Sequence, residues 1–127
     1  MDEIRREAGF DVDADELWQA IVDDERRSEW LGDSRIEVEP GGAGHVDLDD
    51  GRRWVRVDEV DEGRRLTFDW WADGEEPSRV TFVVAPDGGG SHLTVIERRP
   101  AAPVARASIA DRVLDLEAML LRVLVSA

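Results

Sequence analysis

The feature that most restricts the fold of this chain is a run of short alternating segments between residues 35 and 99. Turn sequences separate these segments, namely "PGGAG", "DDGR", "DEGR", "ADGEEPS" and "PDGGGS". Alternation of apolar and polar residues with a period of two is typical of strands with one buried face, and clusters of Gly, Pro and Asp favour turns. The stretch therefore predicts six consecutive antiparallel strands.

The adjacent Trp70 and Trp71 lie in one of these strands, and successive side chains of a strand leave by opposite faces. A turn centred on residues 61–64 sets a register between the two strands that it connects. In this register the apolar pairs lie on one face of the sheet, and a charge pair and a tryptophan pair lie on the other. The predicted opposite pairs are Val55–Trp70, Val57–Phe68, Arg56–Asp69 and Trp54–Trp71. We therefore expect Trp70 to point inward and Trp71 outward, and Val60 to require a β-bulge.

The same parity predicts the pairing of the other hairpins. The predicted neighbours are Asp49–Arg52, Val46–Val55, Trp70–Val80, Phe68–Phe82 and Trp71–Arg79. Arg79 could then stack on the ring of Trp71.

The remaining segments predict one more strand and three helices. Alternation over residues 4–10 indicates a strand, Asp13 is the expected N-cap of a helix, and a second short helix is expected to end at Gly32. Residues 109–126 predict a long helix whose apolar stripe suits packing on a sheet. The stripe consists of Ile109, Val113, Leu116, Met119, Leu120, Val123 and Leu124. A second arc, Leu114, Leu121 and Val125, could be a homodimer contact or could pack on strand ends.

Charge and composition exclude several classes of function. The formal charge is −14, all 16 basic residues are Arg, and there is no Cys. Such a surface repels phosphate backbones and anionic lipids, so we expect neither nucleic-acid nor membrane binding. The first residues lack the apolar core of a signal peptide. We expect a soluble, cytoplasmic single domain spanning residues 1–127, without cofactor or metal.

Several segments resemble the SRPBCC (START-like) superfamily, in the branch similar to the activator of the heat-shock-protein-90 ATPase. They are "DVDADELWQAIVDDERRSEWLGD", "PGG", "DDGRRWVRVDEVDEGRRLTFDWW" and "SRVTFVV". The matching features are Trp18, the Trp30-Leu31 pair, the Gly41-Gly42 pair and the pattern Leu66-x-Phe68-x-Trp70. The similarity runs from about residue 4 to residue 99.

This resemblance implies an α+β helix-grip fold, in which a curved antiparallel sheet of about seven strands wraps around a long C-terminal helix. The expected order is one strand, two helices, six strands and a final helix. The resemblance also implies a cavity between sheet and helix, which different relatives use for lipids, hormones, polyketide intermediates or antibiotic-like molecules.

The function expected from these features is non-enzymatic binding of a small, largely apolar or aromatic ligand in that cavity. The expected lining residues are Trp30, Val55, Phe68, Trp70, Phe82, Val95 and Met119. Glu97 has inward parity, and a buried carboxylate needs a partner. If the first strand pairs with the last so that Phe10 faces Leu93, Arg6 faces Glu97. This pair could anchor a ligand's carbonyl, hydroxyl or phenol, or it could be a structural ion pair.

Two alternatives use other chemistry. A cyclase or dehydratase of the same superfamily would need an acid or base in the cavity, where Glu97 and Arg6 are the candidates. A co-chaperone-like interaction module would use the outer face of the sheet, formed by Trp54, Arg56, Asp69, Trp71 and Arg79. Both histidines, His45 and His92, are expected to face solvent, which disfavours catalysis by either.

Overall fold

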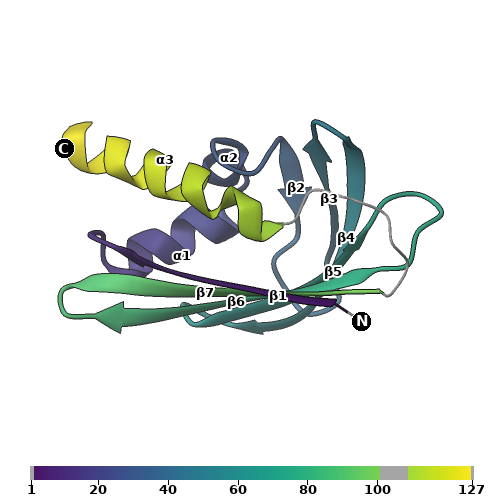
Figure 1. The fold of residues 1–127 in the computed structure, drawn as a ribbon, viewed down its shortest axis with the longest axis horizontal. Coiled ribbons are helices and arrows are strands. Elements are labelled where there is room, and N and C mark those ends of the chain that lie inside the picture. Colours follow the sequence, from purple (N-terminus) through teal and green to yellow (C-terminus); the bar gives the residue numbers. More distant parts are fainter. Residues whose placement is uncertain (1, 101–108, 127) are drawn as a thin grey trace.

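A single antiparallel sheet carries the fold, and the helices lie on its concave side (Figure 1). The computed structural model describes residues 2–100 and 109–126. Its strands are β1 (Asp2–Phe10), β2 (Ser34–Ile36), β3 (Ala43–Leu48), β4 (Gly51–Asp61), β5 (Arg65–Trp71), β6 (Ser78–Asp87) and β7 (Gly90–Arg99). Its helices are α1 (Ala14–Val22), α2 (Asp24–Ser28), the short 3-10 helix η1 (Ile109–Arg112) and α3 (Val113–Ser126).

The seven strands are ordered β1-β7-β6-β5-β4-β3-β2. Consecutive strands from β2 to β7 form hairpins, while β1 pairs with β7 and closes the order on the other side. The expected architecture of one strand, two helices, six strands and a final helix is therefore confirmed, as is the α+β helix-grip class.

Local chemistry explains where the first two helices begin. The Asp13 carboxylate caps α1 by accepting the backbone N–H of Glu16 at 2.8 Å, as expected. Asp23 caps α2 in the same way. The second helix ends at Ser28, earlier than the predicted Gly32. The backbone N–H groups of Trp30 and Leu31, which follow it, both donate to the carbonyl of Arg27. Helices this short depend on packing for their stability.

The register predicted between β4 and β5 is confirmed at all four pairs. Val55 lies opposite Trp70 and Trp54 opposite Trp71, with a register shift between Val57 and Glu59 that supplies the expected bulge. Trp70 is buried, whereas Trp71 is half-buried on the outer face.

Three other predicted registers are wrong by two residues. The turn between β3 and β4 is Asp49-Asp50, so Arg52 faces Asp47 rather than Asp49 and Val46 faces Arg53 rather than Val55. Between β5 and β6, Trp70 faces Ser78 rather than Val80, and Phe68 faces Val80 rather than Phe82. Between β1 and β7, Phe10 faces Ser91 rather than Leu93, and Arg6 faces Val95 rather than Glu97. A shift of two leaves every side chain on its predicted face, so alternation alone could not detect it.

The C-terminal helix covers the concave face as expected, although its first turn is the 3-10 helix η1. The described members of its apolar stripe are all buried, namely Ile109, Val113, Leu116, Met119 and Leu120. In the second arc, Leu114 and Leu121 are 69% and 59% exposed. The side chains of Val123, Leu124 and Val125 lie outside the described residues.

Candidate functional site

The seven apolar residues predicted to line a cavity come together on the concave face as one packed cluster. Every one of them is buried, from Val95 at 0% to Trp30 at 4% exposure. The centre of the Phe68 ring lies 6.2 Å from the centre of the Trp70 ring and 6.0 Å from that of Phe82. The Trp30 ring contacts Phe82 edge-on, with 6.3 Å between the ring centres. These side chains therefore form an aromatic layer between the sheet and the helices.

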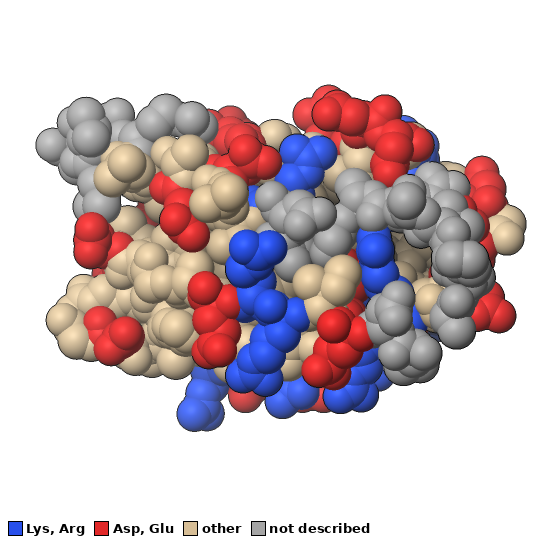
Figure 2. Space-filling view, viewed as in Figure 1, with Lys and Arg blue, Asp and Glu red and all other residues tan. Residues whose placement is uncertain are grey.

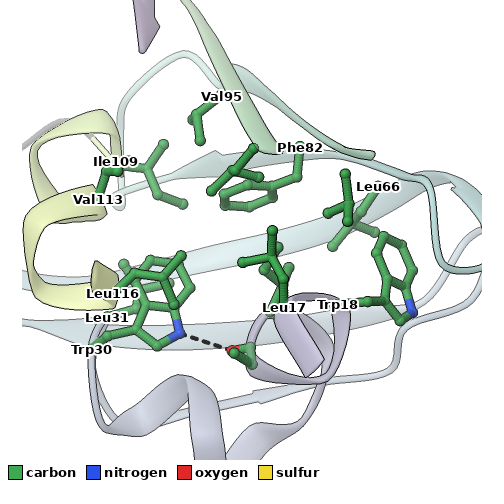
Figure 3. Packing of buried hydrophobic residues seen from close by; sticks show 14 of the residues in the cluster. Leu17, Trp18, Trp30, Leu31, Leu66, Phe82, Val95, Ile109, Val113 and Leu116 are labelled. Carbon is green, nitrogen blue, oxygen red and sulfur yellow. Dashed lines mark hydrogen bonds between the residues drawn. The ribbon is translucent and has the colours of Figure 1, made fainter. Parts of the chain in front are cut away.

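Trp30 lies at the junction of this layer with the C-terminal helix. Its indole N–H donates to the carbonyl of Ala20 at 2.8 Å, and its ring lies near Leu31 and Leu116 (Figure 3). Trp30 was predicted to line a cavity. The ring is instead almost fully covered, although it borders an open cavity of 340 Å³ at the start of the C-terminal helix.

Two cavities flank the first turns of α3. One lies between the chain after α2, the β3–β4 hairpin and the residues Arg112, Asp115 and Ala118. The other, also of 340 Å³, lies between residues 9–12 and the apolar side chains Leu114, Leu120 and Leu121. In the described part of the chain, Trp30 borders the first of these two cavities, and none of the other eight predicted site residues borders either one.

Glu97 is the polar centre of the concave face and is fully buried. Its Oε2 accepts the indole N–H of Trp70 at 2.9 Å, and its Oε1 accepts the backbone N–H of Ile109 at 3.1 Å. Hydrogen bonds of this kind offset the cost of burying a carboxylate. One side chain of β7 thus joins β5 to the first residue of the C-terminal helical segment.

Arg53 is a site residue that sequence reasoning missed. It is 4% exposed, and its guanidinium lies 4.3 Å from the centre of the Trp70 ring, a cation–π contact. Its Nη2 lies 3.3 Å from the carboxylate of Asp50. The signal was available, because Arg53 has the same strand parity as the inward Val55 and Val57.

The predicted pair of Arg6 and Glu97 does not match the observed register. Arg6 is exposed and faces Val95, whereas Glu97 faces Ile4. The structure instead brings Trp70, Glu97 and Arg53 together, with the indole ring between a carboxylate at its edge and a guanidinium over its face. We call these three residues the buried polar triad.

A second buried cation, Arg27, has a structural environment. Burial lowers the pKa of its guanidinium, while Asp24 beside it acts in the opposite direction. Its Nε donates to the Ser34 hydroxyl at 2.8 Å and its Nη1 to the carbonyl of Ile21 at 2.9 Å. Arg27 therefore ties the end of α1 to α2 and β2, away from the aromatic layer.

The outer face keeps its aromatic pair but not the predicted stacking. Trp54 is 37% exposed, donates its indole N–H to Asp73 at 2.8 Å and carries Arg52 over its ring at 5.6 Å. Arg79 lies beside Asp69 rather than Trp71, and this hydrogen-bonded carboxylate raises the pKa of the Arg79 guanidinium.

Residues 2–100 and 109–126 provide neither a cluster of metal-ligating side chains nor a membrane-spanning helix. They contain no group of three or more His, Asp or Glu side chains arranged to hold a metal ion. Within the same residues, none of the helices combines the length and the apolar character needed to cross a membrane.

Comparison with known proteins places the whole arrangement in a broader context. The family model described as "Activator of Hsp90 ATPase homolog 1-like protein" matches residues 11–117. No curated protein matches the chain.

Several solved structures share its fold. DynU16, from the dynemicin biosynthetic locus, superposes with a TM-score of 0.80 at 28% identity, over 98% of this chain and 47% of DynU16. The chain thus spans about half the length of that protein. MLL2253 from Mesorhizobium loti gives 0.77 at 19% identity, over 95% and 98% of the two chains. CalU16 from Micromonospora echinospora gives 0.69 at 21% identity, over 95% and 74%.

Proposed function

We propose that this chain, which belongs to the family of activator of Hsp90 ATPase homolog 1-like proteins, binds a small molecule. The ligand is largely apolar or aromatic and lies between the concave sheet and the C-terminal helix. Binding takes place without chemical transformation of the ligand. The proposed walls are the apolar residues Trp30, Val55, Phe68, Trp70, Phe82, Val95 and Met119.

The observation that carries this proposal is the buried polar triad. Glu97 is the one acidic residue among the buried side chains that the structure describes, and it lies within an otherwise apolar and aromatic layer. Small-molecule sites are typically apolar with a few convergent polar groups that orient the ligand. The triad supplies a carboxylate, a guanidinium and an indole in one place.

The chemistry of the triad indicates the class of ligand. A carboxylate offers about four acceptor positions, so Glu97 can accept a ligand hydroxyl or phenol in addition to Trp70 and Ile109. The flat rings of Phe68 and Phe82 suit an aromatic or fused-ring body. The ligand proposed is therefore an apolar molecule with at least one hydroxyl group.

Entry of such a ligand requires movement of the C-terminal helix, because the wall residues are packed against one another in the described state. The cavities on either side of the first turns of α3 support this step, since they leave space beside the helix. The association of DynU16 with the dynemicin locus is also in keeping with a role near a small molecule.

Binding can be tested by titrating ¹⁵N-labelled protein with phenolic compounds and with matched analogues that lack the hydroxyl. We expect shifts of the Trp70 indole signal and of the amides of Phe68 and Val95. In Glu97→Gln the affinity for the phenol should fall about tenfold, the loss expected for one charge-assisted hydrogen bond. The affinity for the analogue should not change.

The matched control is Glu7→Gln, which neutralises an exposed carboxylate on β1. It should bind both compounds as the unmodified protein does. Absence of any shift on the concave face across the panel would overturn the proposal. Conversion of a compound that is lost in Glu97→Gln would overturn its non-enzymatic part and favour the cyclase or dehydratase alternative.

The exposed Trp54 favours one second candidate, a co-chaperone-like contact through the outer face. Trp54 lies beside the ring of His45 at 6.3 Å and below Arg52, a combination found in protein interfaces. Purified Hsp90 is the partner to test, with its ATPase rate as the readout. A double Trp54→Ala, Trp71→Ala variant that stimulates the rate as well as the unmodified chain would exclude this candidate.

A further inference from the structure

The first strand, β1, is the longer of the two edge strands of the sheet. It lies at one end of the strand order and spans nine residues, whereas the strand at the other end, β2, spans three. An edge strand presents backbone N–H and C=O groups that can pair with another strand. The edge of β1 is therefore the larger of the two surfaces on which the sheet could be extended.

The charges of β1 are complementary to those of a second copy of β1 that runs antiparallel to it. Residues 2–6 are Asp-Glu-Ile-Arg-Arg, so two acids precede Ile4 and two bases follow it. In an antiparallel pair of two such strands centred on Ile4, Glu3 faces Arg5 of the second strand, and Asp2 faces Arg6. Every charge in the five-residue stretch then meets its opposite.

From this complementarity we infer that a second copy of the chain docks on β1, about a twofold axis at Ile4. The two sheets then continue into each other with their concave faces on the same side, because residues of equal parity face one another. The pairs of Glu3 with Arg5 lie on the outer face. The two Ile4 side chains, each half-buried in one copy, meet on the concave side.

Net charge makes this edge the favourable place for self-association. The chain carries a charge of −14, so two copies repel each other over most approaches. Residues 2–6 are neutral in sum, and basic side chains lie between acidic ones along the path of β1 (Figures 1 and 2). Since exposed ion pairs contribute little individually, their role here is to select the register, while backbone hydrogen bonds join the strands.

The neighbouring registers are disfavoured by like charges. Centring the pair on Arg5 sets Arg5 against itself and Glu3 against Glu7, and centring it on Arg6 sets two Arg6 side chains together. Glu3 already pairs with Arg98 of β7 at 3.0 Å. In the register centred on Ile4 the same carboxylate lies between Arg98 and the Arg5 of the second copy, so the row of charges continues across the junction.

Cysteine trapping tests the register directly, because the chain has no Cys of its own. In the proposed dimer the two residues at position 4 face each other at about 4.5–5.5 Å between Cα atoms, within the range of a disulfide. Under mild oxidation, Ile4→Cys should therefore form a disulfide dimer about tenfold faster or more than Arg5→Cys, Arg6→Cys or the distant Arg64→Cys, because pairing raises the effective thiol concentration. Equal rates, or a faster reaction of Arg6→Cys, would overturn the proposal.

Charge reversal tests the partner. In analytical ultracentrifugation we expect the unmodified protein to have twice its 14.2 kDa mass at high concentration. The salt concentration is about 0.15 M, which screens the net repulsion between the two copies beyond about 8 Å. The variants Arg5→Glu/Arg6→Glu and Asp2→Arg/Glu3→Arg should each remain monomeric, and an equimolar mixture of the two should recover the dimer. The mixture is informative because a variant that fails to fold could not restore association.

The control Arg64→Glu/Arg65→Glu, at the β4–β5 turn, changes the net charge by the same amount as Arg5→Glu/Arg6→Glu. It should leave the dimer intact. A monomeric unmodified protein at millimolar concentration would overturn the proposal. It would also be overturned if Leu114→Ser/Leu121→Ser abolished dimerisation while both charge reversals preserved it. That result would assign the contact to the C-terminal helix.

Discussion

Trp70 donates its indole N–H to the carboxylate of Glu97 at 2.9 Å, with both side chains buried on the concave face. The second oxygen of Glu97 accepts the backbone N–H of Ile109, where the C-terminal helical segment begins. This one carboxylate thus connects the start of the C-terminal helical segment to the sheet. The proposed ligand site and the stability of the fold depend on the same group.

Replacing Glu97 by Gln should lower the free energy of unfolding by about 1–3 kcal/mol. The amide has one acceptor oxygen for two buried donors, so either Trp70 or Ile109 loses its partner. Urea denaturation monitored by Trp fluorescence measures the effect, with the exposed Glu7→Gln as control. An unchanged midpoint would show that the two N–H groups find other acceptors.

Trp70→Phe should lower the free energy of unfolding by about 1.5–3 kcal/mol, because it removes the N–H group that donates to the charged Glu97 carboxylate. The smaller phenyl ring also leaves buried volume unfilled, so the measured loss combines the hydrogen bond with packing. A double-mutant cycle with Glu97→Gln measures the coupling of the two side chains. Strictly additive losses would contradict a direct interaction between them.

Arg27→Met should lower the free energy of unfolding by about 3 kcal/mol, since each buried group left without its partner costs about 1–3 kcal/mol. The groups concerned are the carbonyl of Ile21 and the hydroxyl of Ser34. The matched control is Arg26→Met, at the neighbouring position, where an ion pair with the partly exposed Glu16 is worth less than about 1 kcal/mol. Equal losses in the two variants would contradict the structural role of Arg27.

Arg52→Gln should raise the pKa of Asp47. In the unmodified protein the hydrogen bond from Arg52, at 2.7 Å, lowers that pKa below its ordinary value of 3.8. The stability that this pair contributes is therefore present above the unfolded-state pKa and is lost as pH falls through the depressed folded-state pKa. Carboxyl ¹³C chemical shifts followed during an acid titration measure both values, and identical curves for the two proteins would refute the assignment.

Gly42→Ala should destabilise the protein by about 1–3 kcal/mol, the range for forced overpacking. A Cβ at this position would lie 2.0 Å from the carbonyl oxygen of Glu37, so the chain before β3 would have to shift. Gly9→Ala is the control, because its Cβ would lie 4.0 Å from the nearest backbone oxygen. Thermal unfolding of both variants tests this explanation of the Gly41-Gly42 pair.

Much of the fold could be predicted from local patterns. The number of strands, the N-cap at Asp13 and the opposite directions of Trp70 and Trp71 all follow from periodicity and capping chemistry. The same parity predicts that Glu97 points inward, and it would have predicted Arg53 as well. These features depend on neighbours in the sequence, which is why they can be read without the structure.

The partners of the inward polar residues could not be predicted in this way. An alternating pattern is unchanged by a slide of two residues, so it assigns Glu97 to a face but leaves open whether Arg6 or Ile4 lies opposite. The sequence by itself determined the faces of the strands. Only the tertiary structure decided the registers of the β1–β7, β3–β4 and β5–β6 pairs. It also gave the Glu97 carboxylate to Trp70 and Ile109, because buried polar groups must meet partners from distant segments.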